Sequence, residues 1–292
     1  MKLAAIDIGS NAIRLLIEEV REFNNQIRID KVSLTRVPVR LGEDVFTTGR
    51  ISDERLRQLV KTMRAFWYIM DVHQVEMFRA CATSAMREAT NSKSVLETIE
   101  REANFKVEVL SGESEAELIF SNYVAQNLNA KGNYLYIDVG GGSTEITLIR
   151  KGKKIKGKSF SIGTVRMLAG KVEKDTWKEI DRWLKSTIKG GGKILAIGTG
   201  GNVNTLFKLQ GKKPQELLTF QEIQTLCNEL STVDVDERIF KYRLRPDRAD
   251  VIIPACEIYL RIMRTAGVKQ MIVPKIGLSD GIILKMAEQI KG

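Results

Sequence analysis

Two stretches of the chain share one order of hydrophobic and polar positions. Near the start, an apolar run at 3–6 leads into Asp7-Ile8-Gly9-Ser10-Asn11, and apolar residues return at 13–17. In the middle, an apolar run at 134–137 leads into Asp138-Val139-Gly140-Gly141-Gly142-Ser143-Thr144-Glu145. Each stretch predicts a strand, a tight glycine turn and a second strand. Because the two stretches lie almost half a chain apart, we expect an internal duplication whose halves face each other across a cleft.

Around these hairpins, alternating strand and helix patterns predict an α/β protein. Strands are expected at 26–32, 34–37, 75–81, 106–109, 193–197 and 270–274, and a polar loop at 40–45. Helical spacing of apolar residues predicts helices at 53–70, 93–103, 111–128, 177–188, 220–230, 251–266 and 282–290. Ser52 is expected to cap the first helix. That helix should bury one apolar face, made of Leu56, Leu59, Val60, Met63, Phe66 and Trp67.

Length and composition limit the class of protein. At 292 residues the chain exceeds what one hydrophobic core usually holds, so two domains are expected. No run approaches the roughly 18 apolar residues of a membrane span, and no signal-peptide pattern precedes the first strand. We therefore expect a cytoplasmic protein without a membrane partner. Cys81, Cys227 and Cys256 are scattered, which argues against disulfides and a zinc site and predicts three reduced, buried thiols.

Charge and histidine content narrow the chemistry. The net charge of +10 suits an anionic partner such as polyphosphate, a nucleotide or nucleic acid, although it also fits charge spread for solubility. No basic stretch interleaved with aromatic residues supports nucleic acid. His73 is the single histidine, which disfavours histidine metal clusters and serine–histidine triads. The chemistry must then rest on carboxylates, hydroxyls, backbone amides and basic groups.

The glycine hairpin that begins at Asp138 is the first candidate site. Three consecutive glycines let the backbone approach a ligand closely, and successive amides in such a turn form an anion-binding concavity. An aspartate beside a phosphate suits a divalent cation such as Mg²⁺. The alternative is an ordinary hairpin, but three glycines exceed what a two-residue hairpin needs. We expect a phosphate and metal site here.

Two helix starts carry further candidate chemistry. Arg87 follows a strand end and the hydroxyls of Thr83 and Ser84. It is either a second anion contact or part of a simply capped helix. Three acids, Glu113, Glu115 and Glu117, crowd another first turn, where they either favour the helix dipole or supply a general base. Spacing alone does not choose among the three.

Other segments offer contacts for phosphate or a polyanion. A third glycine turn at 198–204, which contains Gly200 and Gly201, precedes a helix and could admit a nucleotide or phosphate. Five lysines follow the central hairpin, at 151, 153, 154, 156 and 158, and alternate members should share one strand face. They form either a rail for a polyanion or a solvated sheet edge. The densest basic cluster spans 238–248.

The sequence resembles the exopolyphosphatase/guanosine pentaphosphate phosphohydrolase (Ppx/GppA) family over essentially its whole length. The matching segments are 7–11, 82–89, 111–116, 138–145, 198–204 and Asp280-Gly281. The resemblance implies two duplicated ribonuclease H-like domains of the actin-like ATPase type, with mixed sheets flanked by helices and a cleft between them. The domains would span 1–124 and 125–280, and a C-terminal helix at 281–292 would pack back on the first domain.

The resemblance also assigns roles to residues. In the family the Glu before Ala is the general base, which maps to Glu115, and Arg87 and Ser143 would act with it. Asp7 and Asp138 would organise Mg²⁺ or another divalent cation, with Glu145 close by. The phosphate would be held by Ser10, Asn11, Arg14, Arg87, Gly140, Gly141, Gly142, Ser143, Thr144, Gly200 and Gly201. Ala12 departs from the family, in which many members carry Ser.

Together with these residues, the resemblance implies a phosphohydrolase that removes the terminal phosphate from inorganic polyphosphate, guanosine pentaphosphate or both, by Mg²⁺-assisted attack of water. Two alternatives stay open, namely a phosphotransferase of the same superfamily and a non-catalytic regulator that binds a nucleotide or alarmone. The resemblance further implies that the protein can form homodimers.

Overall fold

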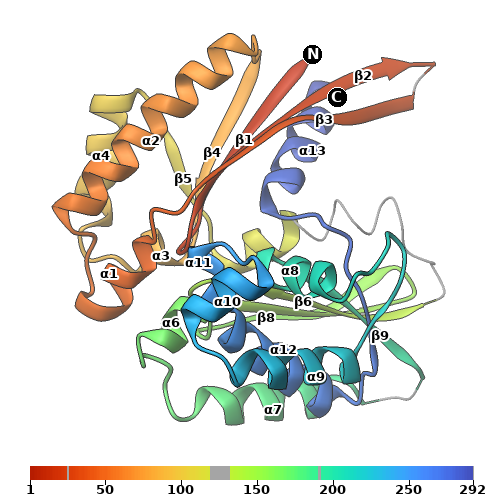
Figure 1. The fold of residues 1–292 in the computed structure, drawn as a ribbon. Coiled ribbons are helices and arrows are strands. Elements are labelled where there is room, and N and C mark those ends of the chain that lie inside the picture. Colours follow the sequence, from red (N-terminus) through yellow and green to blue (C-terminus); the bar gives the residue numbers. More distant parts are fainter. Residues whose placement is uncertain (25, 119–131, 190–191, 292) are drawn as a thin grey trace. The chain divides into compact units, whose positions relative to one another are not determined.

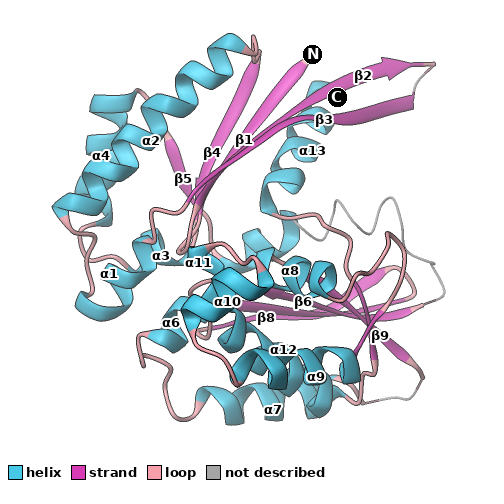
Figure 2. Ribbon diagram, viewed as in Figure 1, coloured by secondary structure: helices cyan, strands magenta, loops and turns pink. Residues whose placement is uncertain are grey.

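The structure is a computed structural model and describes residues 1–24, 26–118, 132–189 and 192–291 (Figure 1). The chain forms two compact units. Unit 1 consists of Met1–Asn122 together with Gly277–Gly292, and unit 2 consists of Tyr123–Ile276. Each unit is built on one mixed sheet with helices packed on it (Figure 2). In the described ranges, no helix has the length and apolar character that a membrane crossing requires.

The unit 1 sheet has the strand order β3-β2-β1-β4-β5. Its strands are β1 (Lys2–Ile8), β2 (Ile13–Phe23), β3 (Gln26–Val37), β4 (Met77–Ala82) and β5 (Val107–Val109). β1, β2 and β3 form an antiparallel meander, and β4 and β5 add parallel strands beside β1. Every β1 residue from Leu3 to Ile8 is buried, which is typical of a strand covered on both faces.

Helices cover both faces of this sheet. They are α1 (Leu41–Thr48), α2 (Asp53–Val72), α3 (Ser84–Glu88), α4 (Ser92–Ala103) and α13 (Leu278–Lys291), and residues 112–118 are also helical. Figure 1 shows α2 and α4 on one side of the sheet and α13, which packs on β1 and β2, on the other. The C-terminal segment therefore closes the second face of the N-terminal sheet.

The unit 2 sheet has the strand order β10-β11-β9-β6-β7-β8. Its strands are β6 (Asn133–Val139), β7 (Thr144–Arg150), β8 (Lys153–Phe160), β9 (Ile194–Thr199), β10 (Leu218–Thr219) and β11 (Gln270–Ile272). The helices of the unit are α6 (Thr164–Leu168), α7 (Thr176–Thr187), α8 (Gly201–Leu209), α9 (Phe220–Ser231), α10 (Val235–Tyr242), α11 (Pro246–Ala249) and α12 (Ile252–Ala266). The apolar α12 contacts α7, α9 and β6 and lies at the centre of the core.

The two sheets repeat one plan, as the sequence predicts. The meander β1-β2-β3 with parallel β4 and β5 corresponds to the meander β6-β7-β8 with parallel β9 and β11. The two aspartates occupy the same place in this plan. Asp7 lies opposite Arg14 on β2 and Cys81 on β4. Asp138 lies opposite Glu145 on β7 and Thr199 on β9.

Some local predictions about unit 1 are wrong. The expected loop at 40–45 is helix α1, whose Leu41, Val45 and Phe46 are buried. A Cβ at Gly42 would come within 2.9 Å of the Ser10 Cβ, so this glycine permits close packing rather than a loop. Ser52 does cap α2, by accepting a hydrogen bond from the Arg55 backbone N–H. Trp67, predicted as core, is 43% exposed.

The cysteine prediction is also wrong in part. Cys227 on α9 and Cys256 on α12 form a disulfide with a Cα–Cα distance of 6.1 Å, across two helices that pack together. The two cysteines are 29 residues apart, a separation that ordinarily contributes about 3–4 kcal/mol by restricting the unfolded chain. Cys81 is free and buried as expected, and burial raises the pKa of its thiol to about 12.

Two carboxylates meet where α13 packs on the unit 1 sheet. Asp280, in the first turn of α13, accepts a hydrogen bond from the Gly277 backbone N–H at 2.8 Å and lies 3.9 Å from the Lys31 ammonium. Glu18 on β2 is 7% exposed. Burial, and to a lesser extent the charge of Asp280, raises the pKa of Glu18 to about 7, against the opposing effect of Lys31. Burial likewise raises the pKa of Asp280.

This raised pKa predicts a pH dependence of stability. The folded chain keeps a proton on Glu18 that the unfolded chain releases, so the contribution of Glu18 is fully present below about pH 4.5 and is lost as pH rises through about 7. Glu18→Gln should flatten the dependence of the unfolding free energy on pH in this window. Urea denaturation across the window measures it. Glu19→Gln, on the same strand, is the control, because Arg21 lowers the pKa of Glu19 out of the window. An unchanged slope for Glu18→Gln would contradict the assignment.

Candidate active site

The glycine turn between β6 and β7 is held from one side by α6. The Val165 backbone N–H donates to the Gly141 carbonyl at 2.8 Å, and the Thr164 N–H donates to the Gly140 carbonyl at 3.0 Å. The Arg166 side chain, buried beneath the turn, donates from Nε to the Gly142 carbonyl at 2.7 Å. Three successive carbonyls of the turn therefore point toward α6.

The opposite side of the turn presents amides. In a planar trans peptide the N–H points away from the C=O of the same unit. Because the carbonyls of Gly140, Gly141 and Gly142 face α6, the N–H groups of Gly141, Gly142 and Ser143 point away from it. Successive amides aligned in this way form an anion-binding concavity. The geometry is consistent with the predicted phosphate role of these residues.

Gly163 sets the distance between α6 and the turn. A Cβ at this position would lie 2.5 Å from the Gly141 carbonyl carbon and 2.5 Å from the Gly142 nitrogen, both of which are backbone atoms. Thr144 secures the same contact by donating from Oγ1 to the Ile162 carbonyl at 2.6 Å. The sequence analysis did not identify this role of Gly163, because it depends on contact with a segment that is not adjacent in the sequence.

A row of polar residues crosses the unit 2 sheet beside the turn. The strand register places Ser159, Glu145, Asp138 and Thr199 side by side on β8, β7, β6 and β9. Ser159 donates to Glu145 Oε1 at 2.8 Å, and Thr199 donates to Asp138 Oδ1 at 2.8 Å. Glu145 is 1% and Asp138 9% exposed. The structure thus brings together two of the predicted metal residues.

The donor chemistry of this pair fits a divalent cation. Two neighbouring buried carboxylates repel each other unless a proton or a cation intervenes. Oxygen ligands of this kind are what Mg²⁺ prefers, usually as one or two carboxylates with water and substrate phosphate. Within the described part of the chain, no group of three or more His, Cys, Asp or Glu side chains is placed to hold a metal. The chemistry of the pair thus fits the metal role that the resemblance implies for Asp138 and Glu145.

Asp138 belongs to a larger buried network. The Tyr136 hydroxyl lies 2.5 Å from Thr199 Oγ1, and the Tyr259 hydroxyl donates to the Thr199 carbonyl. Burial raises the pKa of both tyrosines well above its usual value, with a further contribution from Asp138, so both hydroxyls stay protonated. Sequence reasoning gave neither tyrosine a functional role, since both lie within apolar segments that are typical of core.

The third glycine turn packs against the same residues. Gly200 has a φ of +101°, and a Cβ there would lie 2.9 Å from the Val139 carbonyl and 3.2 Å from Asp138 Oδ1. A Cβ at Gly201 would overlap the Arg248 guanidinium, which donates to Asn202 Oδ1 at 3.0 Å. The predicted phosphate residues Gly200 and Gly201 thus lie beside Asp138 and Arg248. Sequence reasoning identified Arg248 only as one member of the basic cluster at 238–248.

The equivalent hairpin of unit 1 has a different electrostatic character. Arg14 donates to Asp7 Oδ2 at 2.6 Å, so a predicted phosphate residue neutralises a predicted metal residue. The buried hydroxyls of Ser10 and Ser84 are 2.8 Å apart. The backbone N–H of Arg40 donates to the carbonyl of Asn11, which fixes the turn against the start of α1.

Burial separates the three candidate acids in unit 1. Glu115 is half-buried, whereas Glu113 and Glu117 are exposed. Arg87 on α3 lies 3.9 Å from Glu115 Oε2 and donates to the Leu110 carbonyl at 2.6 Å. The structure thus brings Arg87 and Glu115 together. The predicted continuation of this helix to 128 lies outside the described residues.

The lysine prediction is wrong at one position. On β8, Lys156 lies opposite Leu148 and Lys154 lies opposite Ile149, so Ile155 is the extra residue of a β-bulge. Directly opposed residues share a face, whereas Leu148 and Ile149 point to opposite faces. Lys154 therefore lies on the face that carries Glu145. The Cε atom of Lys154 lies 3.1 Å from the position that a Cβ at residue 157 would occupy, so the lysine side chain runs along β8 in the direction of Ser159. Lys158, by contrast, pairs with Glu179 at 2.7 Å.

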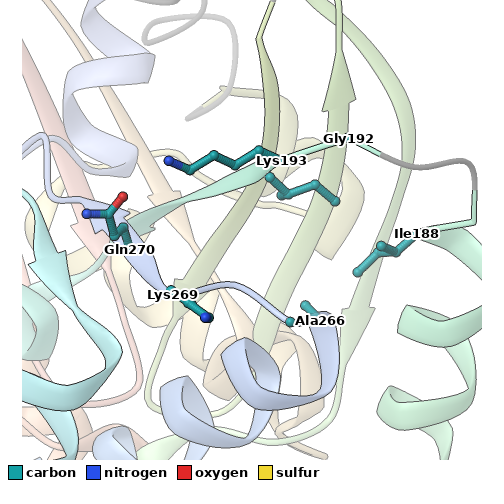
Figure 3. A pocket seen from close by; sticks show the side chains of 8 residues that line it. Ile188, Gly192, Lys193, Ala266, Lys269 and Gln270 are labelled. Atoms are coloured by element: carbon teal, nitrogen blue, oxygen red, sulfur yellow. The ribbon is translucent and has the colours of Figure 1, made fainter.

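A separate cavity of about 320 Å³ lies at the other end of the unit 2 sheet (Figure 3). Lys193, Lys269 and Gln270 line it, at the start of β9 and β11. Asp138 and Thr199 lie near the opposite, carboxyl ends of β6 and β9. Ligands of open α/β sheets bind outside the carboxyl ends of the strands. The cavity is therefore not the candidate active site.

Comparisons with known proteins agree on one family. The model of the Ppx/GppA phosphatase family matches residues 17–290. Exopolyphosphatase 2 of Mycobacterium tuberculosis is 27% identical over 98% of both chains. Guanosine-5'-triphosphate,3'-diphosphate pyrophosphatase of Aeromonas hydrophila is 26% identical over 96% of this chain and 58% of that protein. A bifunctional 3-dehydroquinate synthase/phosphatase of Fusobacterium nucleatum is 28% identical, and the chain spans only 46% of its length.

A solved structure confirms the fold. The crystal structure of the Aquifex aeolicus member of the Ppx/GppA family is 26% identical, with a TM-score of 0.76, and the match covers 100% of this chain and 99% of that one. The predicted class, two duplicated actin-like domains with mixed sheets flanked by helices, is thus correct.

The contact at Gly163 generates a prediction about the glycine turn. Gly163→Ala should displace the turn, because the new methyl would meet backbone atoms that cannot rotate away. We expect a loss of roughly 1–3 kcal/mol of stability, typical of overpacking, and weaker binding of tripolyphosphate. Urea denaturation and calorimetric titration measure the two effects. Ser161→Ala, at an exposed neighbouring position, is the control. Unchanged binding by a folded Gly163→Ala protein would show that the turn does not hold the anion.

Proposed function

Because the chain belongs to the Ppx/GppA phosphatase family, we propose that it hydrolyses phosphoanhydrides, removing the terminal phosphate from inorganic polyphosphate, guanosine pentaphosphate or both. The observation that carries the proposal is the glycine turn, whose three aligned amides lie next to the buried pair of Asp138 and Glu145. The names of the mycobacterial exopolyphosphatase and the Aeromonas pyrophosphatase support the two substrate classes.

The reaction is a transfer of the terminal phosphoryl group to water. The Glu115 carboxylate accepts a proton from water, the water oxygen forms a bond to the terminal phosphorus, and the bridging P–O bond breaks. Orthophosphate and a substrate shortened by one phosphate leave, and the proton returns to solvent. Glu115 is suited to this role because it is the half-buried member of its acidic cluster and lies beside Arg87.

Positive groups and amides offset the charge on the transferred phosphoryl oxygens. The N–H groups of Gly141, Gly142 and Ser143 bind these oxygens, and the Arg87 guanidinium adds a cationic donor. One well-placed donor of this kind is typically worth about 3 kcal/mol of barrier. Asp138 and Glu145 would hold Mg²⁺, which supplies Lewis-acid stabilisation of the phosphate oxygens when bound. In unit 1, Ser10, Asn11 and Arg14 would contact phosphate. Arg14 also pairs with Asp7, the other aspartate that the resemblance assigns to the metal.

Substitution of the proposed base tests catalysis. Glu115→Gln removes the proton acceptor but keeps the size of the side chain, so turnover should fall by about 10²- to 10⁴-fold with little change in KM. Phosphate release from polyphosphates of several lengths and from guanosine pentaphosphate, with and without Mg²⁺, measures this. Glu117→Gln, at an exposed position of the same helix, is the matched control. Near wild-type turnover of Glu115→Gln would remove Glu115 from the role.

The same measurements decide whether the protein is a hydrolase. Phosphate release from at least one substrate by the wild-type chain is expected. Zero release from all of them would overturn the proposal and favour the regulator that binds without turnover.

The bulge in β8 generates a prediction about long substrates. Lys154 lies on the Glu145 face and would contact a polyphosphate chain beyond its terminal units, whereas Lys156 lies on the opposite face. Lys154→Gln should raise KM for long polyphosphate roughly two- to fivefold, the effect of up to about 1 kcal/mol from one exposed ion pair. The effect should shrink at high salt. Lys156→Gln is the control, and equal KM values for the two variants would refute the contact.

A further inference from the structure

Thr199 makes a directed contact with one of the proposed metal ligands. Its Oγ1 donates to Asp138 Oδ1 at 2.8 Å, and the threonine is 1% exposed. The contact follows from the sheet register, in which Asp138 on β6 lies beside Thr199 on parallel β9. The hydroxyl therefore reaches the carboxylate from a rigid element, at the end of the sheet where the glycine turn lies.

The hydrogen-bond chain behind Thr199 has one direction. A threonine hydroxyl has a single proton, and Thr199 gives it to Asp138. In the contact of 2.5 Å between the Tyr136 hydroxyl and Thr199 Oγ1, Tyr136 must then be the donor. Tyr259 holds the main chain of the same residue by donating to the Thr199 carbonyl. Two buried tyrosines, from β6 and α12, thus fix Thr199 at its side chain and its backbone.

The other unit shows what this arrangement achieves. Asp7 occupies the same place in the duplicated plan, but its neighbour on β4 is Cys81, and its carboxylate receives a cationic donor from Arg14. Asp138 instead receives a neutral donor and lies opposite a second carboxylate, Glu145. A neutral donor orients a carboxylate without cancelling its charge. Residues that form hydrogen bonds to metal ligands usually have this role.

We propose that Thr199, supported by Tyr136 and Tyr259, is a positioning residue that holds the Asp138 carboxylate in the orientation that binds a divalent cation. This inference rests on the metal role of Asp138 in the proposed function. It adds that the cation affinity of the protein is set by a chain of hydroxyl groups that reaches from the core to the carboxyl end of the sheet. Thr199 itself touches neither the cation nor the substrate.

Binding of Mn²⁺ to the purified full chain, followed by electron paramagnetic resonance without substrate, tests the inference. Thr199→Val keeps the shape of the side chain and removes the donor, so Mn²⁺ affinity should fall about 10- to 100-fold, as for other residues behind metal ligands. Thr199→Ser restores the hydroxyl and should recover most of the affinity. Tyr136→Phe removes the outer donor and should give a smaller loss. Thermal denaturation shows whether each variant is folded.

Several outcomes would overturn the inference. The first is wild-type Mn²⁺ affinity in a folded Thr199→Val protein. The second is an equal loss of affinity in the valine and serine variants, because a purely structural role of Thr199 would not distinguish the two substitutions. If Thr199→Val fails to fold, unchanged Mn²⁺ affinity in Tyr136→Phe refutes the proposed chain of hydrogen bonds instead. The failure of the proposed function is distinguishable, since wild-type protein would then bind Mn²⁺ but release no phosphate from polyphosphate or guanosine pentaphosphate.

Discussion

The planarity of three peptide groups determines what the unit 2 hairpin can bind. Donors on α6, including the Arg166 side chain, bind the carbonyls of Gly140, Gly141 and Gly142 from one side, which fixes the orientation of these peptide groups. The amides of the next residues must then face the other way. This constraint turns a flexible glycine sequence into a fixed set of donors. It depends in turn on Gly163, whose missing side chain lets α6 approach the turn backbone.

The two copies of the duplicated fold place different charges beside their aspartates. Both meanders place an aspartate one residue before the end of their first strand, opposite the second residue of the next strand. In unit 1 the opposite residue is Arg14, which pairs with Asp7 at 2.6 Å. In unit 2 it is Glu145, which adds a second carboxylate to Asp138. One hairpin therefore pairs its aspartate with a cationic side chain, and the other pairs its aspartate with a second carboxylate, an arrangement that suits a divalent cation.

Sequence alone predicted the elements that depend on local patterns and missed those that depend on distant contacts. Both hairpins, the cap at Ser52 and most helices follow from periodicity and turn chemistry. Helix α1 was missed because Gly42 is explained only by its packing near Ser10. The disulfide joins helices that the chain brings together over 29 residues. The bulge at Ile155 has no signature among alternating lysines.

Specificity between the two proposed substrates must come from groups outside the polar row. Polyphosphate and guanosine pentaphosphate both end in a phosphoanhydride, so amides and carboxylates that recognise this group do not separate them. A polymer differs by carrying charge far from the reacting phosphorus, and a nucleotide differs by its base and ribose. Lys154 lies on the Glu145 face several residues from the turn, so the contact proposed for it would involve a polymer rather than a terminal phosphate alone. The β-bulge places Lys154 on that face. If the proposed contact holds, one inserted residue in an edge strand changes the preference for substrate length.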